Sequence, residues 1–320
     1  MDDGAMVRSR LISLALPIGL SFAAISLGSF GTAADAGAST RSSSRDLAIR
    51  IHWTESPTGA SSERGTVADA THSGVDETLV AGTKGGGGVA VNGHYVYWTN
   101  YGTGIDGSGT IGRANLDGSR VNQRFIVGAT SPVGVAVYGP YIYWSNSLLF
   151  YDGRQETTIG RAKIDGSDVN QRFIVPSNGG TIDGLAVNSH YLYWADVSLN
   201  QIGRSDRDGM GVDDAFITGA NAPDGVGVNG NYLYWSNSGE GSIGRAVLDG
   251  SSANQRCVVL SGPVGNEPED VATAGGSVYW TSYPGNAIGQ ASLDEQQCVI
   301  PLSRPKAFLR ASGYCPGGPT

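Results

Sequence analysis

The sequence is poor in charged residues and has no clustered basic stretch, which excludes one broad class of partner. Only 16% of its 320 residues are charged, and 29 Asp and Glu outnumber 21 Lys and Arg, for a formal net charge of -8. Proteins that bind phosphate backbones need Lys and Arg gathered on one surface. We therefore expect no nucleic-acid partner.

The sequence also lacks the short motifs that mark several large enzyme classes. It contains no HExxH, CxxC, GxSxG or Walker sequence. These are the spacings that zinc proteases, redox or zinc sites, serine hydrolases and nucleotide-binding loops require. The four histidines never stand at metal-ligand spacing. From these absences we predict no catalytic residue and no cofactor.

The first 36 residues are typical of a secretory signal. Two arginines precede a mostly apolar stretch, 11–30, and small residues follow it. Cleavage would start the mature chain near Gly37; the alternative is that the apolar stretch stays in place as an anchor. We expect a secreted, extracytoplasmic protein with no stable membrane span after signal removal. The Ser-rich residues 37–46 are predicted to be a flexible linker.

What the sequence does have is glycine, 49 residues, and an internal repeat. Every tryptophan stands in the same local phrase, at successive spacings of 45, 46, 50, 41 and 45 residues. Each unit holds four short apolar runs separated by Asn-Gly or Asp-Gly turns, as antiparallel hairpins do. Four-stranded units of this length are typical of propeller blades. The tryptophans are Trp53, Trp98, Trp144, Trp194, Trp235 and Trp280.

The phrases around these tryptophans resemble a known family. YWTN, YWSN, YWAD and YWSN, each followed by an IGR…DG tail, resemble the YWTD, or low-density-lipoprotein receptor class B, repeats. The resemblance covers roughly residues 51–301 and implies a six-bladed β-propeller. It also implies that the fourth position of the phrase is structural, with a side chain that bonds to backbone. That position holds Asn100, Asn146, Asp196 and Asn237, whereas Glu55 and Ser282 depart from the pattern in the terminal units.

The ring has to close, because an open seam would expose strand edges. The first unit has no inner-strand phrase of its own, whereas residues 307–314 imitate the inner-strand phrase at 88–95. We therefore predict an all-β, six-bladed propeller of four-stranded antiparallel blades over residues 47–315, closed by the C-terminal strand joining the first blade. Residues 316–320 form a tail, and we expect a monomer.

Cysteine is scarce and odd in number. The three residues are Cys257, Cys298 and Cys315. The first two stand where other units have Phe, on outer strands that are expected to lie further apart than the ~7 Å that a disulfide allows between Cα atoms. Cys298 with Cys315 is the favoured pair, which leaves one cysteine over.

The loops between second and third strands differ in length around the ring. From Trp to the first residue of the third strand the distances are 14, 13 and 15 residues in the first three units and 8 in each of the others. We expect the long loops, 55–65, 100–109 and 146–157, to lie on the face where the chain enters the inner strands. Apolar residues in the last of these either anchor a partner or fold back on a neighbouring loop. The candidate ligand-binding residues are Tyr101, Leu149, Phe150, Tyr151 and Asp152.

Acidic residues precede the inner strands of the short-loop half of the ring. They are Asp183, Asp224, Glu269 and Asp270. Carboxylates that converge on the channel mouth would bind a cation or a basic ligand, and Asp183, Asp224 and Glu269 are the candidate metal ligands. The alternative is that each carboxylate bonds to backbone at the start of its strand.

Three functions are compatible with this sequence. The first is a non-enzymatic binding module whose long-loop face contacts an extracellular protein or a saccharide; the resemblance and the missing catalytic motifs favour it. The second is a calcium- or other metal-dependent hydrolase or lactonase, by analogy with six-bladed propellers such as gluconolactonases. The third is a purely structural envelope protein.

Overall fold

The computed structural model describes residues 51–55, 64–71, 74–84, 86–102, 109–149, 155–260, 267–274, 276–283 and 287–292. The predicted signal, linker, closing strand and tail lie outside these ranges. Within them, no helix is long and apolar enough to cross a bilayer.

The described strands form six antiparallel sheets, in each of which a strand pairs with its neighbour in sequence. Four sheets have four strands and two have three. The strands are β1 (Ile51–Glu55), β2 (Arg64–Thr71) and β3 (Gly74–Lys84); β4 (Gly86–Val91), β5 (Tyr95–Asn100), β6 (Gly109–Asn115) and β7 (Asn122–Ala129); β8 (Val135–Tyr138), β9 (Tyr141–Leu149), β10 (Gln155–Lys163) and β11 (Asn170–Ile174); β12 (Ile182–Val187), β13 (Tyr191–Asp196), β14 (Gln201–Asp206) and β15 (Asp213–Thr218); β16 (Val226–Asn229), β17 (Tyr232–Asn237), β18 (Ser242–Val247) and β19 (Asn254–Val259); and β20 (Glu267–Ala274), β21 (Ser277–Tyr283) and β22 (Ala287–Ser292).

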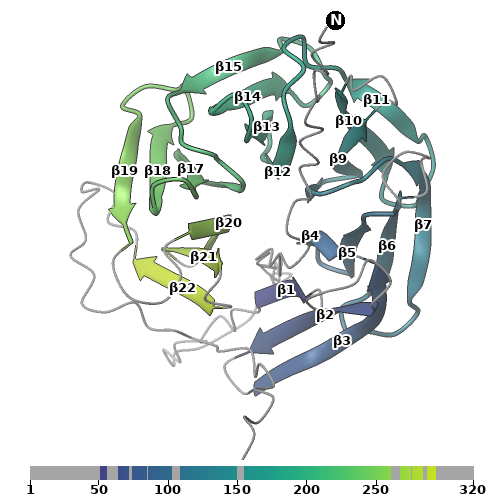
Figure 1. Cartoon of the computed structure of the whole chain (residues 1–320). Helices are drawn as coiled ribbons and strands as arrows, with labels where there is room; N and C mark the ends of the chain where they lie inside the picture. The colour runs from purple at the N-terminus through teal and green to yellow at the C-terminus, as the bar shows by residue number, and fades with distance from the viewer. Residues whose placement is uncertain are drawn as a thin grey trace, which may run out of the picture.

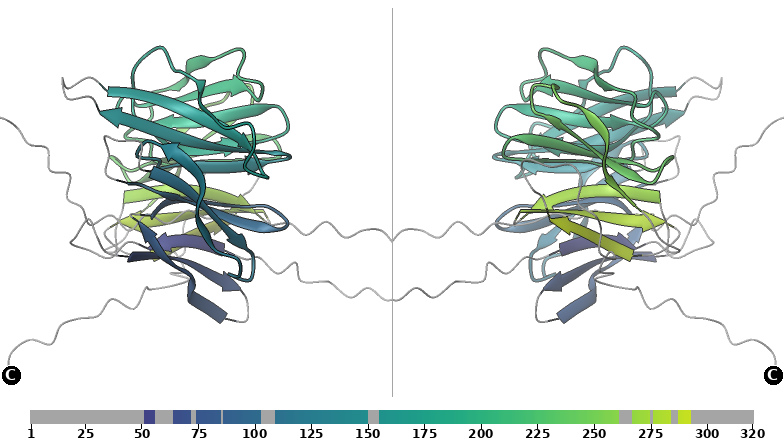
Figure 2. Two further views of the ribbon diagram at one scale, coloured as in Figure 1. Left: turned by 90° about the vertical axis from the view of Figure 1, so that its right-hand side faces the viewer. Right: turned by 90° about the vertical axis from the view of Figure 1, so that its left-hand side faces the viewer.

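The sheets stand around one axis. Figure 1 shows β4, β12 and β20 toward the centre and β3, β7, β11, β15 and β19 on the rim, and Figure 2 shows the strands running from one face of the ring to the other. This arrangement is a β-propeller. The prediction of an all-β propeller built from four-stranded antiparallel blades is confirmed. The strand predicted to close the ring, 307–314, lies outside the described residues.

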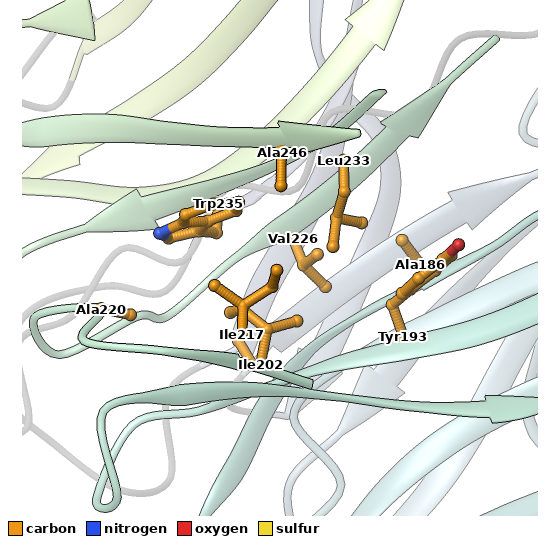
Figure 3. Close-up of a cluster of buried hydrophobic side chains, with 10 residues drawn as sticks. Ala186, Tyr193, Ile202, Ile217, Ala220, Val226, Leu233, Trp235 and Ala246 are labelled. Atoms are coloured by element: carbon orange, nitrogen blue, oxygen red, sulfur yellow. The ribbon is translucent and has the colours of Figure 1, made fainter. Parts of the chain in front are cut away.

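The cores of the molecule lie between sheets rather than within them. Figure 3 shows one: Tyr193 and Ile202 of one sheet pack against Leu233 and Trp235 of the next, and all four are at most 1% exposed. Further clusters of this kind join β4–β7 to β8–β11, β8–β11 to β12–β15, and β16–β19 to β20–β22. Each blade therefore needs its neighbours in order to bury its apolar side chains.

A glycine in the third strand makes room for each buried tryptophan. A Cβ on Gly160 would lie 2.3 Å from the indole of Trp144, and one on Gly203 would lie 2.0 Å from that of Trp194. Atoms separated by this distance overlap, so the IGR phrase requires glycine here. The Trp phrase and the IGR phrase recur together because each completes the packing of the other.

The fourth position of the Trp phrase bonds to backbone, as the resemblance implied. Asn100 accepts a hydrogen bond from the Lys84 amide at 2.9 Å and donates one to the Gln123 carbonyl at 3.0 Å. The side chains of Asn146 and Asn237 make the equivalent pair of bonds. In the fourth unit, Asp196 instead accepts from the Leu199 amide at 3.0 Å. This position ties the second strand to the outer strand of its own sheet and to the segment entering it.

The disulfide prediction is wrong. Cys257 is disulfide-bonded, and with three cysteines in the chain this rules out a bond between Cys298 and Cys315. Cys257 stands at a position that holds Phe in three other blades. In other blades a Phe covers the guanidinium of the IGR arginine, as Phe125 covers Arg113 at 3.9 Å. The smaller Cys257 takes that place in β19, where it is 5% exposed.

The long loop of the third unit is shorter than predicted. β9 continues to Leu149 and β10 begins at Gln155, with Ser147 opposite Thr157 and Leu149 opposite Gln155. The antiparallel pairing of β9 and β10 thus continues beyond Asn146, where the second strand was predicted to end. Residues 146–149 and 155–157, which were predicted to be loop, belong to strands.

Candidate functional site

One face of the ring carries both the second-to-third-strand loops and the entries to the inner strands; we call it the loop face. Residues just after the Trp phrase bond to residues just before the inner strand: the Ser147 amide donates to Thr130 at 2.8 Å, and the Val197 amide to Thr181 at 3.0 Å. The Asp-Gly turns lie at the opposite ends of the strands, on what we call the turn face. Strand direction thus places the acidic entry residues on the same face as the ends of the second strands; the long loops that follow some of these strands lie largely outside the described residues.

A set of hydroxyl groups joins neighbouring blades at the axis. Thr99 donates to the Val133 carbonyl at 3.0 Å, Ser145 to the Asp183 carbonyl at 3.4 Å, and Ser236 to the Glu269 carbonyl at 2.5 Å. In the fourth unit Ala195 has no hydroxyl group, and the Gly184 amide donates to the Asp224 carbonyl at 2.7 Å instead. The carbonyl of the entry residue therefore joins neighbouring blades at four places, Val133, Asp183, Asp224 and Glu269.

The side chain at this position changes from one half of the ring to the other. Gly87 and Val133 hold it in the sheets β4–β7 and β8–β11, whereas Asp183, Asp224 and Glu269 hold it in the next three sheets. Strand register shifts across Asp183, between Ile182 and Leu185, and across Glu269, between Pro268 and Val271. Such bulges redirect side chains.

The acidic residues are close enough to raise one another's pKa. Burial, together with Asp224 and Asp196, raises the pKa of Asp183 to about 8. Burial and Glu267 raise the pKa of Asp224 to about 7, despite a hydrogen bond from Ser238. Burial, and then Asp224, Asp270 and Glu267, raises the pKa of Glu269 to about 8. The charged groups named as causes are all acids, so burial and mutual repulsion both favour the protonated, uncharged form of these carboxyls.

Hydrogen bonding distinguishes the members of this acidic cluster. Asp270 accepts from the Val271 amide at 2.8 Å, so the interpretation of an acid bonded to backbone at a strand start holds for this residue, whose pKa is raised by burial to about 7. Glu269 differs: it is 6% exposed, and its Oε2 atom has no hydrogen-bond partner. An unpaired buried carboxylate oxygen is costly, and groups of this kind gather at functional sites.

The predicted metal ligands do not form a metal-binding group. Among the described residues, no three His, Cys, Asp or Glu side chains lie close enough together to hold a metal ion. Asp224 is near enough to raise the pKa of both Asp183 and Glu269, but among the described residues these acids do not converge on one point at metal–oxygen distances.

The loop candidates are only partly described. Tyr101 lies on the loop face and is 43% exposed. Leu149 ends β9, and Phe150, Tyr151 and Asp152 lie outside the described residues. Whether this segment anchors a partner or folds back on a neighbouring loop stays a prediction.

Sequence reasoning missed the hydroxyl at the third position of the Trp phrase. Thr99, Ser145 and Ser236 were visible as an alternation of Thr and Ser between Trp and Asn. The signal was present, but its meaning depends on the next blade, whose carbonyl lies 33 to 38 residues further along the chain.

No protein-family model and no curated protein matches this chain. Solved structures do. A chain of the nidogen/laminin complex is 20% identical, with a TM-score of 0.58 over 72% of this chain and 88% of that one. A gluconolactonase from Xanthomonas campestris is 18% identical, with a TM-score of 0.55 over 78% and 91%. Virginiamycin B lyase from Staphylococcus aureus is 19% identical, with a TM-score of 0.51 over 84% and 81%.

At these identities the likeness establishes the fold alone. The similar propellers include a chain from a protein–protein complex, a lactonase and a lyase, so the fold does not select among binding and catalysis. The choice has to come from the residues of the loop face.

Proposed function

We propose that the protein is an extracytoplasmic, non-enzymatic binding module that holds a protein or saccharide partner on its loop face. One observation carries the proposal: Glu269 keeps a buried carboxyl oxygen without a partner near the start of β20, at the loop face. The fold uses the backbone carbonyl of this residue, which accepts from Ser236, whereas the Oε2 atom of its side chain accepts no bond. A costly group that the fold does not need is expected where a ligand is bound.

The alternative, a metal-dependent lactonase, has less support. A catalytic calcium or similar ion requires several oxygen ligands at 2.3–2.6 Å from one point. The described residues form no such group. The likeness to a chain of the nidogen/laminin complex is compatible with a protein partner, although it is a likeness of fold.

We propose further that the six sheets form one closed, six-bladed ring, in which the chain after Pro305 supplies the inner strand of the first blade. The sheet β1–β3 has only three strands among the described residues. A chain ending at Pro305 is expected to lose cooperative unfolding, measured by calorimetry and circular dichroism. A truncated chain that melts like the full-length protein overturns the closure.

The binding function is tested by capture from the native cell surface with the full-length mature protein, followed by reconstitution with the captured molecule after its purification. The double variant Phe150→Ser and Tyr151→Ser is expected to melt like the wild type and to weaken partner binding at least tenfold. A matched control is Val121→Ser with Val169→Ser, two valines that are 45% and 44% exposed near the turn face.

One outcome contradicts the proposal, and another moves its test to a different residue. If the control pair weakens reconstituted binding as much as the loop pair, the partner does not use the loop face. If the loop pair unfolds the protein, Phe150 and Tyr151 belong to the core, and the single variant Tyr101→Ser then replaces them as the test of this face.

A further inference from the structure

Cys257 stands at a position that contacts the following blade in four other units. A Cβ on Gly166 would lie 3.1 Å from the ring of Phe125, and one on Gly250 would lie 2.9 Å from that of Phe216. The other two pairs are Gly118 with Leu79, at 3.1 Å, and Gly209 with Phe173, at 3.0 Å. In all four, the glycine belongs to an Asp-Gly turn and comes three residues after the third strand of its sheet. The counterpart of these glycines in the sixth unit is Glu295, three residues after β22.

The sixth unit has a shorter connection after its third strand than the units before it. From the second unit to the fifth, the residue at the Cys257 position comes eight residues after the Asp of the turn, as Phe125 comes after Asp117. Cys298 comes only four residues after Asp294. It is therefore three residues from Glu295, a length of chain that spans at most about 10 Å. The expectation that Cys257 and Cys298 lie too far apart assumed equivalent places on outer strands, which this shorter connection does not provide.

The remaining cysteine, Cys315, is a poorer partner for Cys257. It comes 20 residues after Glu295, and the closure proposed above assigns the residues before it, 307–314, to the inner strand of the first blade. Cys257 belongs to β19, the outer strand of another blade, and is 5% exposed. The inner and outer strands of even one sheet are about 14 Å apart, which is three strand spacings, whereas a disulfide allows about 7 Å between Cα atoms. The closure and a bond from Cys257 to Cys315 are therefore incompatible.

We propose that Cys257 is bonded to Cys298, so that a disulfide joins the fifth blade to the sixth and Cys315 keeps its thiol. The bond takes the place of the Phe ring that packs against the next turn in the three preceding units. Its formation joins the two Sγ atoms and breaks two S–H bonds, and the two electrons and two protons pass to the disulfide of a thiol–disulfide oxidoreductase, which becomes a dithiol. Structural disulfides persist in oxidising compartments outside the cytosol, which is where the proposed function places the protein.

The proposed bond fastens the blade that carries the unpaired carboxyl oxygen of Glu269. The chain between Cys257 and Cys298 contains all of β20, β21 and β22. Figure 1 shows these strands between the sheet β16–β19 and the sheet β1–β3. The disulfide thus holds both ends of the sixth blade to β19, whereas the contact of this blade with the first sheet is noncovalent. Without the bond, β20–β22 are expected to open as one local unit before the rest of the ring.

The bond is tested on the full-length mature protein by mass spectrometry of peptides, after free thiols have been alkylated without reduction. Trypsin and a glutamate-specific protease together separate the three cysteines, because Glu295 lies between the first two and Arg310 between the last two. A linked pair of peptides that contain Cys257 and Cys298 is expected, together with alkylated Cys315. A pair that contains Cys257 and Cys315, or a covalent dimer linked through Cys257, overturns the inference.

A second experiment measures what the bond does. Cys298→Ser is expected to lower the melting temperature by roughly 5–10 °C, the loss that one disulfide implies for a chain of this size. It is also expected to speed hydrogen exchange at least about tenfold in β20–β22 and to leave β8–β15 unchanged. Cys315→Ser is the matched control and should melt like the wild type. A loss from Cys315→Ser as large as that from Cys298→Ser contradicts the inference, and if Cys298→Ser does not fold, the peptide map of the wild type decides.

Discussion

The two halves of the ring share one set of backbone contacts and differ in the side chains that those contacts leave free. In sheets β4–β7 and β8–β11 the entry position holds Gly87 and Val133, and the loops are long. In the next three sheets it holds Asp183, Asp224 and Glu269, and the loops are short. The carbonyl at this position is bonded to the preceding blade in both halves. The comparison shows that this position joins the blades through its backbone carbonyl, whereas its side chain differs from one half of the ring to the other.

The largest expected effect is a loss of stability on replacing the third-strand glycine, and it should be the same in both halves of the ring. Gly160→Ala and Gly203→Ala, one from each half, each place a methyl group against a fully buried indole, at 2.3 Å and 2.0 Å. Each is expected to cost at least about 3 kcal/mol, the upper range for overpacked cores, measured by chemical unfolding. Gly93→Ala, where a Cβ meets nothing within 4 Å, is the control and should be nearly neutral. A large cost in one half only would show that the scaffold is not shared.

A smaller expected effect is a pH dependence of stability that comes from the acidic entry residues of one half. The pKa of Asp224 is raised to about 7 and those of Asp183 and Glu269 to about 8. Between about pH 4 and these values the folded protein retains protons that the unfolded chain has released, so the free energy of unfolding falls as pH rises through this window. Asp224→Asn is therefore expected to raise the melting temperature at about pH 8.5 by roughly 2–4 °C, and by less at about pH 5.

The reverse substitution introduces an acid into the half of the ring that lacks one at the entry position. Val133→Asp places a carboxylate at the equivalent position of the neutral half and is expected to lower the melting temperature at about pH 8.5 more than at about pH 5. A pH-independent change in either variant means that the charge of the entry position does not govern stability, and the electrostatic contrast between the halves is then lost.

The smallest effect concerns the indole nitrogens. Trp144 donates to Gln171 at 2.9 Å, whereas the indole N–H of Trp194 has no partner, because Asp214 stands in place of that Gln. Trp144→Phe is therefore expected to cost about 1 kcal/mol more than Trp194→Phe, the usual net value of one hydrogen bond, in equilibrium unfolding. Equal costs would mean that the Gln contact contributes nothing.

Sequence reasoning recovered the fold because its signals are local. The Trp phrase, the IGR phrase and the Asp-Gly turns each specify a strand or a turn within a few residues, and their period gives the arrangement of sheets. The extended hairpin of β9 and β10 was missed because residues 147–149 and 155–157 have no distinctive turn or strand signal. Their pairing follows from continuing the register of the blade.

The candidate site was recovered less completely. Loop lengths and acidic entry residues predicted a binding face, and Asp183, Asp224 and Glu269 stand at the starts of three inner strands, where their part in binding stays a prediction. The sequence did not separate Asp270, which is bonded to backbone, from Glu269, which has an unpaired oxygen. That distinction depends on contacts within and between blades. The disulfide of Cys257 was missed for a similar reason, since relative strand positions are not a local property.

The hydrogen bonds between neighbouring blades run in opposite directions at two places: arginines donate to the following blade, and glutamines donate to the preceding one. On the turn face Arg113 donates to the Ile164 carbonyl of the following blade, at 3.0 Å, and Arg204 donates to that of Leu248, at 3.2 Å. Toward the rim Gln123 donates backward to the Ala81 carbonyl at 3.0 Å, and Gln255 to that of Thr218 at 2.9 Å. A unit transplanted from one place in the chain to another would thus find matching acceptors on both flanks. Shuffling or duplication of whole units would therefore preserve the contacts between blades while moving the acidic entry residues to other places in the ring.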